Sequence, residues 1–160
     1  HNVRQIAVPS LLAFAYNCLP IKPDPAVLVI ARPSRRGEVY LSAYARTGKE
    51  NLKELLAARP AELAAVPGLF RTVLESQASI WIAGAAAAEV KQAVEQEHAT
   101  YALQTLLPDE ILSSAAGVAR VGAALYAVQQ FTPLDTFEPI YLKEFIPKKQ
   151  KRSAFDRLPF

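Results

Sequence analysis

Apolar residues in the first part of the chain follow two spacings that are typical of strands. Residues 26–32 form an apolar run that ends at an arginine, which indicates a strand buried on both faces. In residues 38–46 apolar and polar side chains alternate, which indicates a half-buried strand. Turn residues at 33–37 separate the two strands, so we expect them to pair as a hairpin. Residues 52–58 are compatible with either a third strand or a helix.

Helical spacing of apolar residues predicts four helices. The first covers residues 10–18 and starts with a serine, a common capping residue. The second starts at Pro60, because proline fits the first turn of a helix, and is interrupted at Pro67. The other two cover residues 85–97 and 109–130. In the longer one the expected buried stripe is Ile111, Ala115, Val118, Gly122 and Leu125.

Two further short strands complete the pattern. One covers residues 79–83 and ends at Gly84, and the other lies within residues 99–105. We expect the strand face that carries Tyr40 and Tyr44 to pack under helices. The order of elements predicts an α/β fold with a mixed sheet flanked by helices. It resembles the ribonuclease H-like lobe that occurs twice in the actin, sugar-kinase and heat-shock-ATPase superfamily.

Composition favours a cytoplasmic globular domain. The chain has 160 residues, of which 51% are hydrophobic and 21% charged, enough to bury a core within one domain. No apolar run is long enough to cross a bilayer, and no secretory signal is visible, so we expect no membrane contact. The single cysteine, Cys18, fits a reducing compartment and is expected to be buried on a helix.

Basic residues are concentrated at one end of the chain. Residues 148–160 hold five cations and one carboxylate, a net charge of +4 against +3 for the whole chain. The first 147 residues are therefore close to neutral. We interpret residues 1–147 as the folded domain and residues 148–160 as a basic tail without fixed structure.

The sequence contains few of the residues that catalysis or metal binding requires. Its two histidines and one cysteine lie far apart, so no zinc site is expected. His98 follows a predicted helix, and we interpret it as a surface capping residue. Neither a Gly-x-Ser-x-Gly elbow nor a glycine-rich phosphate loop occurs. We therefore expect no catalytic residue, no cofactor and no nucleotide site that this chain forms alone.

One turn carries a local cluster of charges. Arg35, Arg36 and Glu38 surround Gly37 between the two hairpin strands. From charge alone this is a solvated hairpin tip with a surface ion pair of small energy.

The segment around this turn resembles a known family. Residues 27–46 are similar to the start of the C-terminal lobe of TsaB (YeaZ) proteins, which carry an Asp-Ala-Arg-x-Gly-Glu-Val-Tyr turn between two strands. The matching residues are Arg35, Gly37, Glu38, Val39 and Tyr40. Pro33 stands where the family has aspartate, so a polar role of that side chain is absent.

Three further segments match the family in order and spacing. Residues 6–15 resemble the segment that joins the two lobes, and Gly84 stands where the family ends a strand with glycine. Near the end, Pro139, Tyr141 and Leu142 match a closing Pro-x-Tyr-Leu-Arg motif, in which a lysine replaces the arginine. The chain holds no methionine and starts at His1, so we interpret it as a C-terminal lobe without its N-terminal lobe.

The resemblance implies a function. TsaB proteins are non-catalytic relatives of TsaD, the transferase of bacterial tRNA threonylcarbamoyladenosine synthesis, and work with the ATPase TsaE. The resemblance thus implies a scaffold subunit without enzymatic activity, despite the family's older name of M22 glycoproteases. Implied partners are TsaD and TsaE, with tRNA contacted indirectly and a homodimer formed through the missing lobe. Of the matching residues, Arg35, Glu38 and Tyr40 are expected to shape the wall of the cleft between lobes, without a catalytic role. The other expected site residues, cleft or family-motif positions and again not catalytic, are Gly37, Gly84 and Tyr141.

Two alternatives remain open at this stage. The chain could be the ATP-binding lobe of a kinase-like enzyme, although only Gly84 represents the glycine-rich adenosine loop expected there. It could also be a tRNA-binding module that uses the basic tail, since Lys and Arg bind phosphates.

Overall fold

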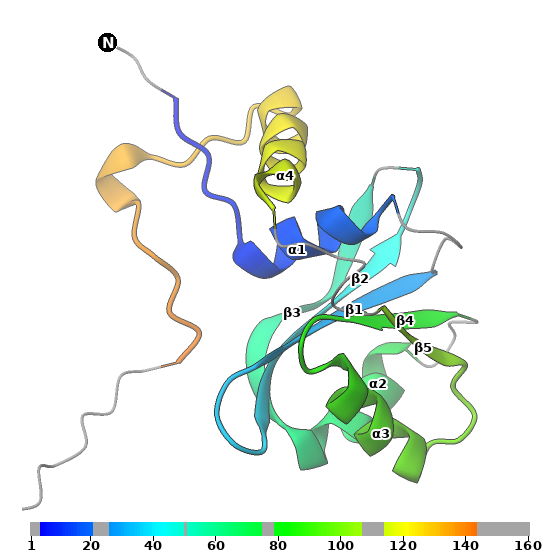
Figure 1. Cartoon of the computed structure of the whole chain (residues 1–160). Helices are drawn as coiled ribbons and strands as arrows, with labels where there is room; N and C mark the ends of the chain where they lie inside the picture. Colours follow the sequence, from blue (N-terminus) through cyan, green and yellow to red (C-terminus); the bar gives the residue numbers. More distant parts are fainter. Residues whose placement is uncertain (1–3, 21–25, 50, 75–78, 107–113, 144–160) are drawn as a thin grey trace, which may run out of the picture.

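The computed structural model describes residues 4–20, 26–49, 51–74, 79–106 and 114–143. It is a five-stranded sheet with helices on both faces (Figure 1). The strands are β1 (Val27–Pro33), β2 (Glu38–Arg46), β3 (Leu52–Glu62), β4 (Ile80–Ala83) and β5 (Leu103–Leu106). The helices are α1 (Ser10–Cys18), α2 (Val66–Leu74), α3 (Ala87–Glu97) and α4 (Ala115–Ala127), with short 3-10 turns η1 (Leu63–Ala65) and η3 (Leu134–Thr136).

The sheet is mixed, as the order of elements predicts. Its strand order is β3-β2-β1-β4-β5. The hairpin β1–β2 and the pair β2–β3 are antiparallel, whereas β4 and β5 run parallel to β1. This arrangement confirms the predicted α/β class, and it resolves residues 52–58 as strand.

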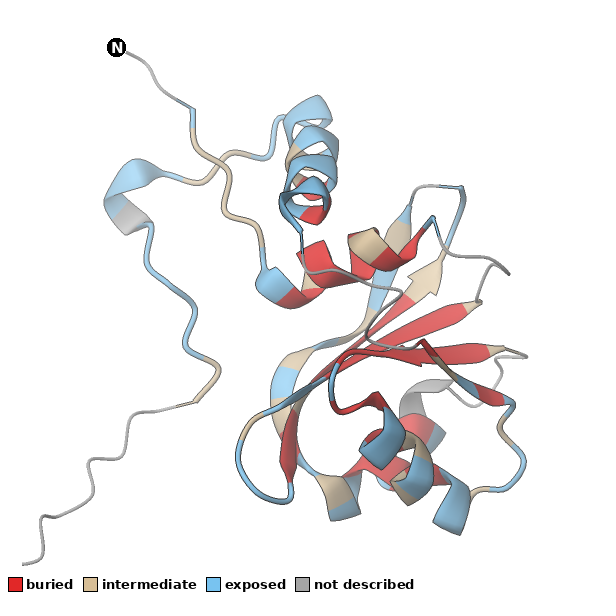
Figure 2. Ribbon diagram, viewed as in Figure 1, coloured by how far each residue is buried: buried red, intermediate tan, exposed pale blue. Residues whose placement is uncertain are grey.

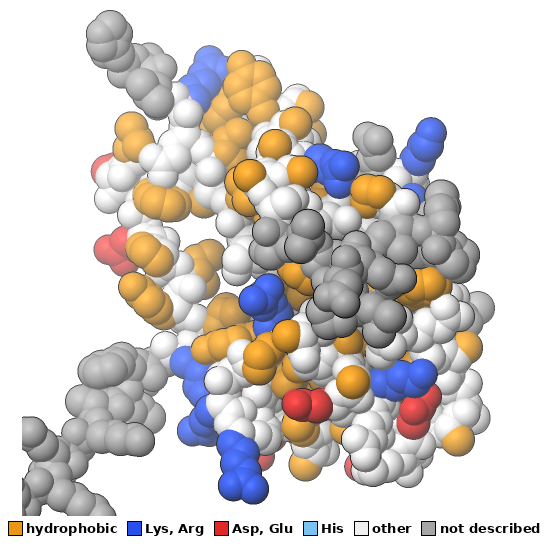
Figure 3. Space-filling view, in the orientation of Figure 1, with side chains coloured by type: hydrophobic (Ala, Val, Ile, Leu, Met, Phe, Trp, Pro, Cys, Tyr) orange, Lys and Arg blue, Asp and Glu red, His pale blue; other side chains and the backbone are white. Residues whose placement is uncertain are grey.

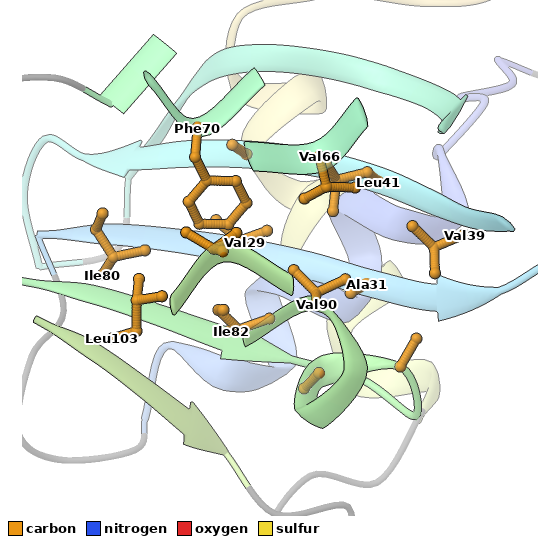
Figure 4. Packing of buried hydrophobic residues seen from close by; sticks show 14 of the residues in the cluster. Val29, Ala31, Val39, Leu41, Val66, Phe70, Ile80, Ile82, Val90 and Leu103 are labelled. Atoms are coloured by element: carbon orange, nitrogen blue, oxygen red, sulfur yellow. The ribbon is translucent and has the colours of Figure 1, made fainter. Parts of the chain in front are cut away.

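Each face of the sheet is covered by a different helix layer. On one face α2 and α3 close a core that includes Phe70 and Val90, both at most 2% exposed (Figure 4). On the other face α1 packs through Leu11 and Phe14, and α4 packs against α1 (Figure 1). The predicted burial of β1 on both faces is confirmed, since residues 27–31 are all buried (Figure 2).

Helix α1 also decides the burial of β2. The sequence predicts a half-buried strand, and this prediction is wrong because the helix covers the second face. Ser42 and Tyr44 are at most 2% exposed there. The expected packing of this tyrosine under a helix is confirmed, while Tyr40 near the start of β2 is only partly buried.

Several predicted boundaries differ from the structure. No helix starts at Pro60, because β3 continues to Glu62; Pro67 instead lies in the first turn of α2, where its missing N–H costs nothing. Helix α1 receives no side-chain cap from the described residues, so the predicted capping role of Ser10 is wrong. The predicted burial of Val118 is also wrong, since this residue is 48% exposed.

Helix α4 buries a narrower stripe than expected. Its buried residues are Gly117 and Val121, one position away from the predicted stripe. The predicted part of this helix that falls within 107–113 lies outside the described residues. No helix of the described chain is long and apolar enough to cross a membrane.

Strand β3 forms one edge of the sheet and is irregular. Its register to β2 shifts twice, between the pairs Leu41↔Arg59 and Ala43↔Leu56, and again before Tyr44↔Glu54. Such bulges are common in edge strands, because they make the edge a poor template for another strand.

Beyond α4 the described part of the chain is extended, apart from the 3-10 turn η3. After α4 the chain pairs with the N-terminal segment through a bridge between Gln5 and Thr132. The Thr132 hydroxyl accepts a hydrogen bond from the Ala7 amide at 2.9 Å. The basic tail, residues 148–160, lies outside the described residues.

Candidate functional site

The hairpin turn between β1 and β2 is fixed by backbone hydrogen bonds. The Glu38 amide donates to the Arg35 carbonyl at 2.9 Å, and the Ser34 amide donates to the Glu38 carbonyl at 3.1 Å. Gly37 adopts φ +75°, in the left-handed region that favours glycine. Its carbonyl accepts a hydrogen bond from the Leu63 amide at 2.9 Å, which ties the turn to the end of β3.

Glu38 is the buried carboxylate of this turn, with 7% of its side chain exposed. The Ser34 hydroxyl donates to its Oε1 at 2.7 Å, and Arg35 Nε lies 3.1 Å from its Oε2. The third partner comes from the other end of the described chain, where Lys143 Nζ donates to Oε1. Three side chains from two segments, the hairpin turn and the C-terminal segment, therefore meet at one carboxylate.

These partners keep Glu38 charged. The hydrogen bond from Lys143 contributes most, followed by that from Ser34, and together they hold the pKa of Glu38 below its ordinary value. Burial opposes this shift but is outweighed. The carboxylate consequently carries a negative charge at neutral pH.

A pocket of about 420 Å³ lies beside this contact. Its walls come from the start of α1, the end of β1, Tyr40 of β2 and the extended C-terminal segment. Of the predicted site residues, Tyr40 and Tyr141 line it, although they lie 101 positions apart in the sequence (141 − 40). The lining residues are Ser10, Leu11, Arg32, Pro33, Tyr40, Ile140, Tyr141, Leu142 and Lys143.

Gly84 has a different role from the other predicted residues. It adopts φ +108°, and a Cβ added there would lie 2.2 Å from the carbonyl oxygen of Ala31. The close approach lets that oxygen accept a hydrogen bond from the Ala86 amide at 3.2 Å. Gly84 is not among the described residues that line the pocket; it fixes the passage from β4 into α3.

The structure thus brings five of the six predicted residues to one place. Arg35, Gly37 and Glu38 form the turn, and the two tyrosines line the adjacent pocket. Sequence reasoning missed the role of Ser34 and of Lys143. The role of Lys143 could have been inferred from its charge, since it is a cation at the last position of the C-terminal motif. A buried carboxylate such as Glu38 requires a partner of this kind.

Other titratable candidates have structural roles. His98 lies at the C-cap of α3, as predicted, with its ring edge-on to Tyr101 at 5.9 Å. Cys18 is buried as predicted, and burial raises the pKa of its thiol to about 12, so it stays protonated at neutral pH. Within the described segments, no three His, Cys, Asp or Glu side chains lie together as metal ligands would.

Comparison with known proteins defines the class of fold. The chain matches no known family model, and it matches no curated protein sequence. It does match solved structures with the ribonuclease H-like, actin-like α/β fold. The predicted α/β fold, a mixed sheet flanked by helices, is thereby confirmed.

The neighbours in question are YeaZ structures. One is YeaZ from Pseudomonas aeruginosa, with a TM-score of 0.64 and 16% identity over 87% of this chain. The other is described as an uncharacterized protein with similarity to peptidase YEAZ from Pseudomonas aeruginosa, with a TM-score of 0.63 and 16% identity over 88% of this chain. This chain spans 59% of the length of each. The fold is YeaZ-like.

Proposed function

We propose that this chain is a non-catalytic scaffold in bacterial synthesis of threonylcarbamoyladenosine in tRNA. In this role it is the C-terminal lobe of a TsaB (YeaZ)-type protein. It supports the transferase TsaD in the cytoplasm, with the ATPase TsaE as a further partner.

The YeaZ-like fold supports the setting, and the Glu38 contact carries the proposal. The two segments that resemble family motifs, the hairpin turn and the C-terminal segment, meet at this carboxylate. A group that serves as a general base works best with a pKa near the operating pH. The lowered pKa of Glu38 and its three partners instead support a role in holding the two motifs together.

An exposed apolar surface supports a role in protein association. Large apolar side chains are exposed along α4 and the segment that follows it. In a helix packed directly on the sheet, such side chains would be buried. Where such exposed apolar side chains form one patch, the patch is typical of interaction sites. The exposed residues are Val118, Tyr126, Val128, Leu134, Phe137, Ile140 and Tyr141.

A reconstituted threonylcarbamoylation assay tests the proposal. Modification of tRNA is measured with TsaD and TsaE in the presence and absence of this protein. We expect modification to collapse without the protein and to return when it is added. Equal modification in both cases would contradict the scaffold role.

A paired set of variants tests the site within that assay. Replacing Arg35 and Glu38 by alanine removes the ion pair at the hairpin, and we expect weaker support of TsaD with an unchanged circular dichroism spectrum. The matched control replaces Lys91 and Glu95, an ion pair at 3.6 Å on α3, which should have no effect. If both double variants support TsaD fully, the hairpin is no part of the functional surface, whatever the outcome for the whole protein.

A further inference from the structure

Two tyrosines from segments far apart in the sequence line the pocket. Tyr40 lies on β2, and Tyr141 lies on the extended C-terminal segment with 83% of its side chain exposed. Aromatic rings at the surface of a pocket offer stacking platforms for a flat ligand. A pocket of about 420 Å³ falls within the ordinary range of small-ligand sites.

The charged groups of the pocket are cations. Arg32 and Lys143 are among the described lining residues, and none of these lining residues is a carboxylate. The Arg32 guanidinium lies 5.5 Å from the centroid of the Phe14 ring, a cation–π contact that holds it at the pocket wall. Nearby Glu38 is already paired with Lys143 and Arg35, so its charge is compensated.

The cationic surface continues beyond the pocket. Arg35 has a side chain that is 68% exposed, and Arg36 beside it in the turn is exposed as well. In Figure 3 Lys and Arg side chains gather at the lower left, over the β1–β2 hairpin. A ligand that fills the pocket and carries further anionic groups would therefore meet further cations along the hairpin.

We propose that this pocket binds one unpaired nucleotide of a single-stranded RNA. The base stacks on Tyr141 and lies against Tyr40, and its phosphate faces Arg32. Flanking phosphates lie along Arg35 and Arg36, which is why RNA fits the surface better than a free mononucleotide. The proposal stands on the pocket alone and is independent of any scaffold role.

Binding of a fluorescent oligoadenylate RNA, measured by anisotropy, tests the proposal. Removing a stacking ring costs a single-stranded complex about tenfold in affinity, so Tyr141→Ala should weaken binding by about that factor. Tyr141→Phe keeps the ring and should bind as the wild type does. Arg32→Gln should lower the slope of log affinity against log salt concentration by about 0.7, the value for one lost phosphate contact.

Matched controls exclude general effects of surface substitution. Tyr126→Ala removes a tyrosine of α4 that is 58% exposed, and Arg71→Gln removes an exposed cation of α2. Both should bind RNA like the wild type. Circular dichroism and melting temperature should be unchanged in all variants, because the replaced side chains are exposed.

Three outcomes would overturn the proposal. The first is the absence of measurable RNA binding at low salt. The second is equal affinity of Tyr141→Ala and Tyr126→Ala, which would place the RNA elsewhere. The third is competition by AMP at the same concentration as the oligonucleotide, which would assign the pocket to a free nucleotide. No transferase is present in this assay, so its result is separate from that of the scaffold role.

Discussion

The backbone of Gly117 in α4 passes so close to α1 that a Cβ at position 117 would lie 2.1 Å from the carbonyl oxygen of Ala13. Beside it, the Ser114 hydroxyl donates to Oδ1 of Asn17 at 3.1 Å. Helix α4 is thus attached to the molecule by a close helix–helix contact that only glycine permits.

This contact predicts opposite effects of alanine at two glycines of one helix. Gly117→Ala should lower the free energy of unfolding by about 1–3 kcal/mol, because the added methyl group forces the helices apart. Gly122→Ala, whose Cβ would have no described atom within 4 Å, should raise it by up to about 1 kcal/mol through helix propensity. Urea unfolding measures both, and equal signs would contradict the contact.

A second pair of glycines separates backbone strain from steric overlap. Gly37→Ala places a side chain at φ +75° with no described atom within 4 Å, and should cost about 1–2 kcal/mol. Gly84→Ala adds an overlap with Ala31 to a strained φ of +108° and should cost about 3 kcal/mol or more. If urea unfolding finds Gly37→Ala the more damaging of the two, the close approach at Gly84 is refuted.

The charge of Glu38 predicts a loss of stability in acid. Its pKa in the folded protein lies below the ordinary value of 4.5, mainly because of Lys143, so folding favours the charged form. The resulting stabilisation is complete above the ordinary pKa and is lost as pH falls through the lower folded pKa. The urea midpoint of the wild type should therefore fall more steeply than that of Glu38→Gln as pH decreases from about 5.

Lys143 supplies the control for this pH dependence. In Lys143→Ala the urea midpoint should fall less steeply with decreasing pH than in the wild type, and so more like that of Glu38→Gln. The reason is that this variant removes the largest cause of the lowered pKa of Glu38. Lys143→Arg keeps a cation, so its urea midpoint should fall with pH as steeply as that of the wild type. Identical pH profiles for Lys143→Ala and the wild type would show that the two residues do not interact.

The basic tail gives a prediction for tRNA. Ending the chain after Pro147 removes five cations and one carboxylate and changes the net charge from +3 to −1. If the tail contacts phosphates, this truncation should lower the affinity for tRNA. The slope of log affinity against log salt concentration should also decrease, by about 0.9 for each lost phosphate contact, the value for double-stranded nucleic acid. An unchanged slope, measured by filter binding, would exclude the tail from RNA contact.

Much of the sheet can be predicted from the sequence because its signals are local. The apolar run at 26–32 and the alternation at 38–46 give β1 and β2, and the turn residues between them give the hairpin. Val90 and Val94 lie on the buried side of α3 as their spacing requires. In these segments local pattern and tertiary packing agree.

Local sequence signals fail where contacts between distant segments determine the secondary structure or the buried face. Pro60 has a helix-start signature, but pairing with Tyr40 keeps it in a strand at the sheet edge, where proline is tolerated. In α4 the buried face is chosen by close approach to Ala13, so Gly117 is buried and the bulkier Val118 is not. Hydrophobic spacing alone contains no information about which helix lies opposite.

The candidate site could be predicted from the sequence only in part. The turn residues Arg35, Gly37 and Glu38 are local in sequence and could be identified as one unit. The pairing of Glu38 with Lys143 spans 105 positions, and no spacing rule predicts it. Only the three-dimensional structure shows that the C-terminal motif forms a wall of the pocket.

The contact between Glu38 and Lys143 also sets an order of events during synthesis. It closes a loop of 105 residues, and the entropy that this costs must be offset by structure already formed. All five strands precede residue 107, so the sheet can assemble on the ribosome before Lys143 has left the exit tunnel. A nascent chain halted before Lys143 would have its core but no complete pocket. Ligand binding at this pocket would therefore distinguish chains translated through Lys143 from those released early.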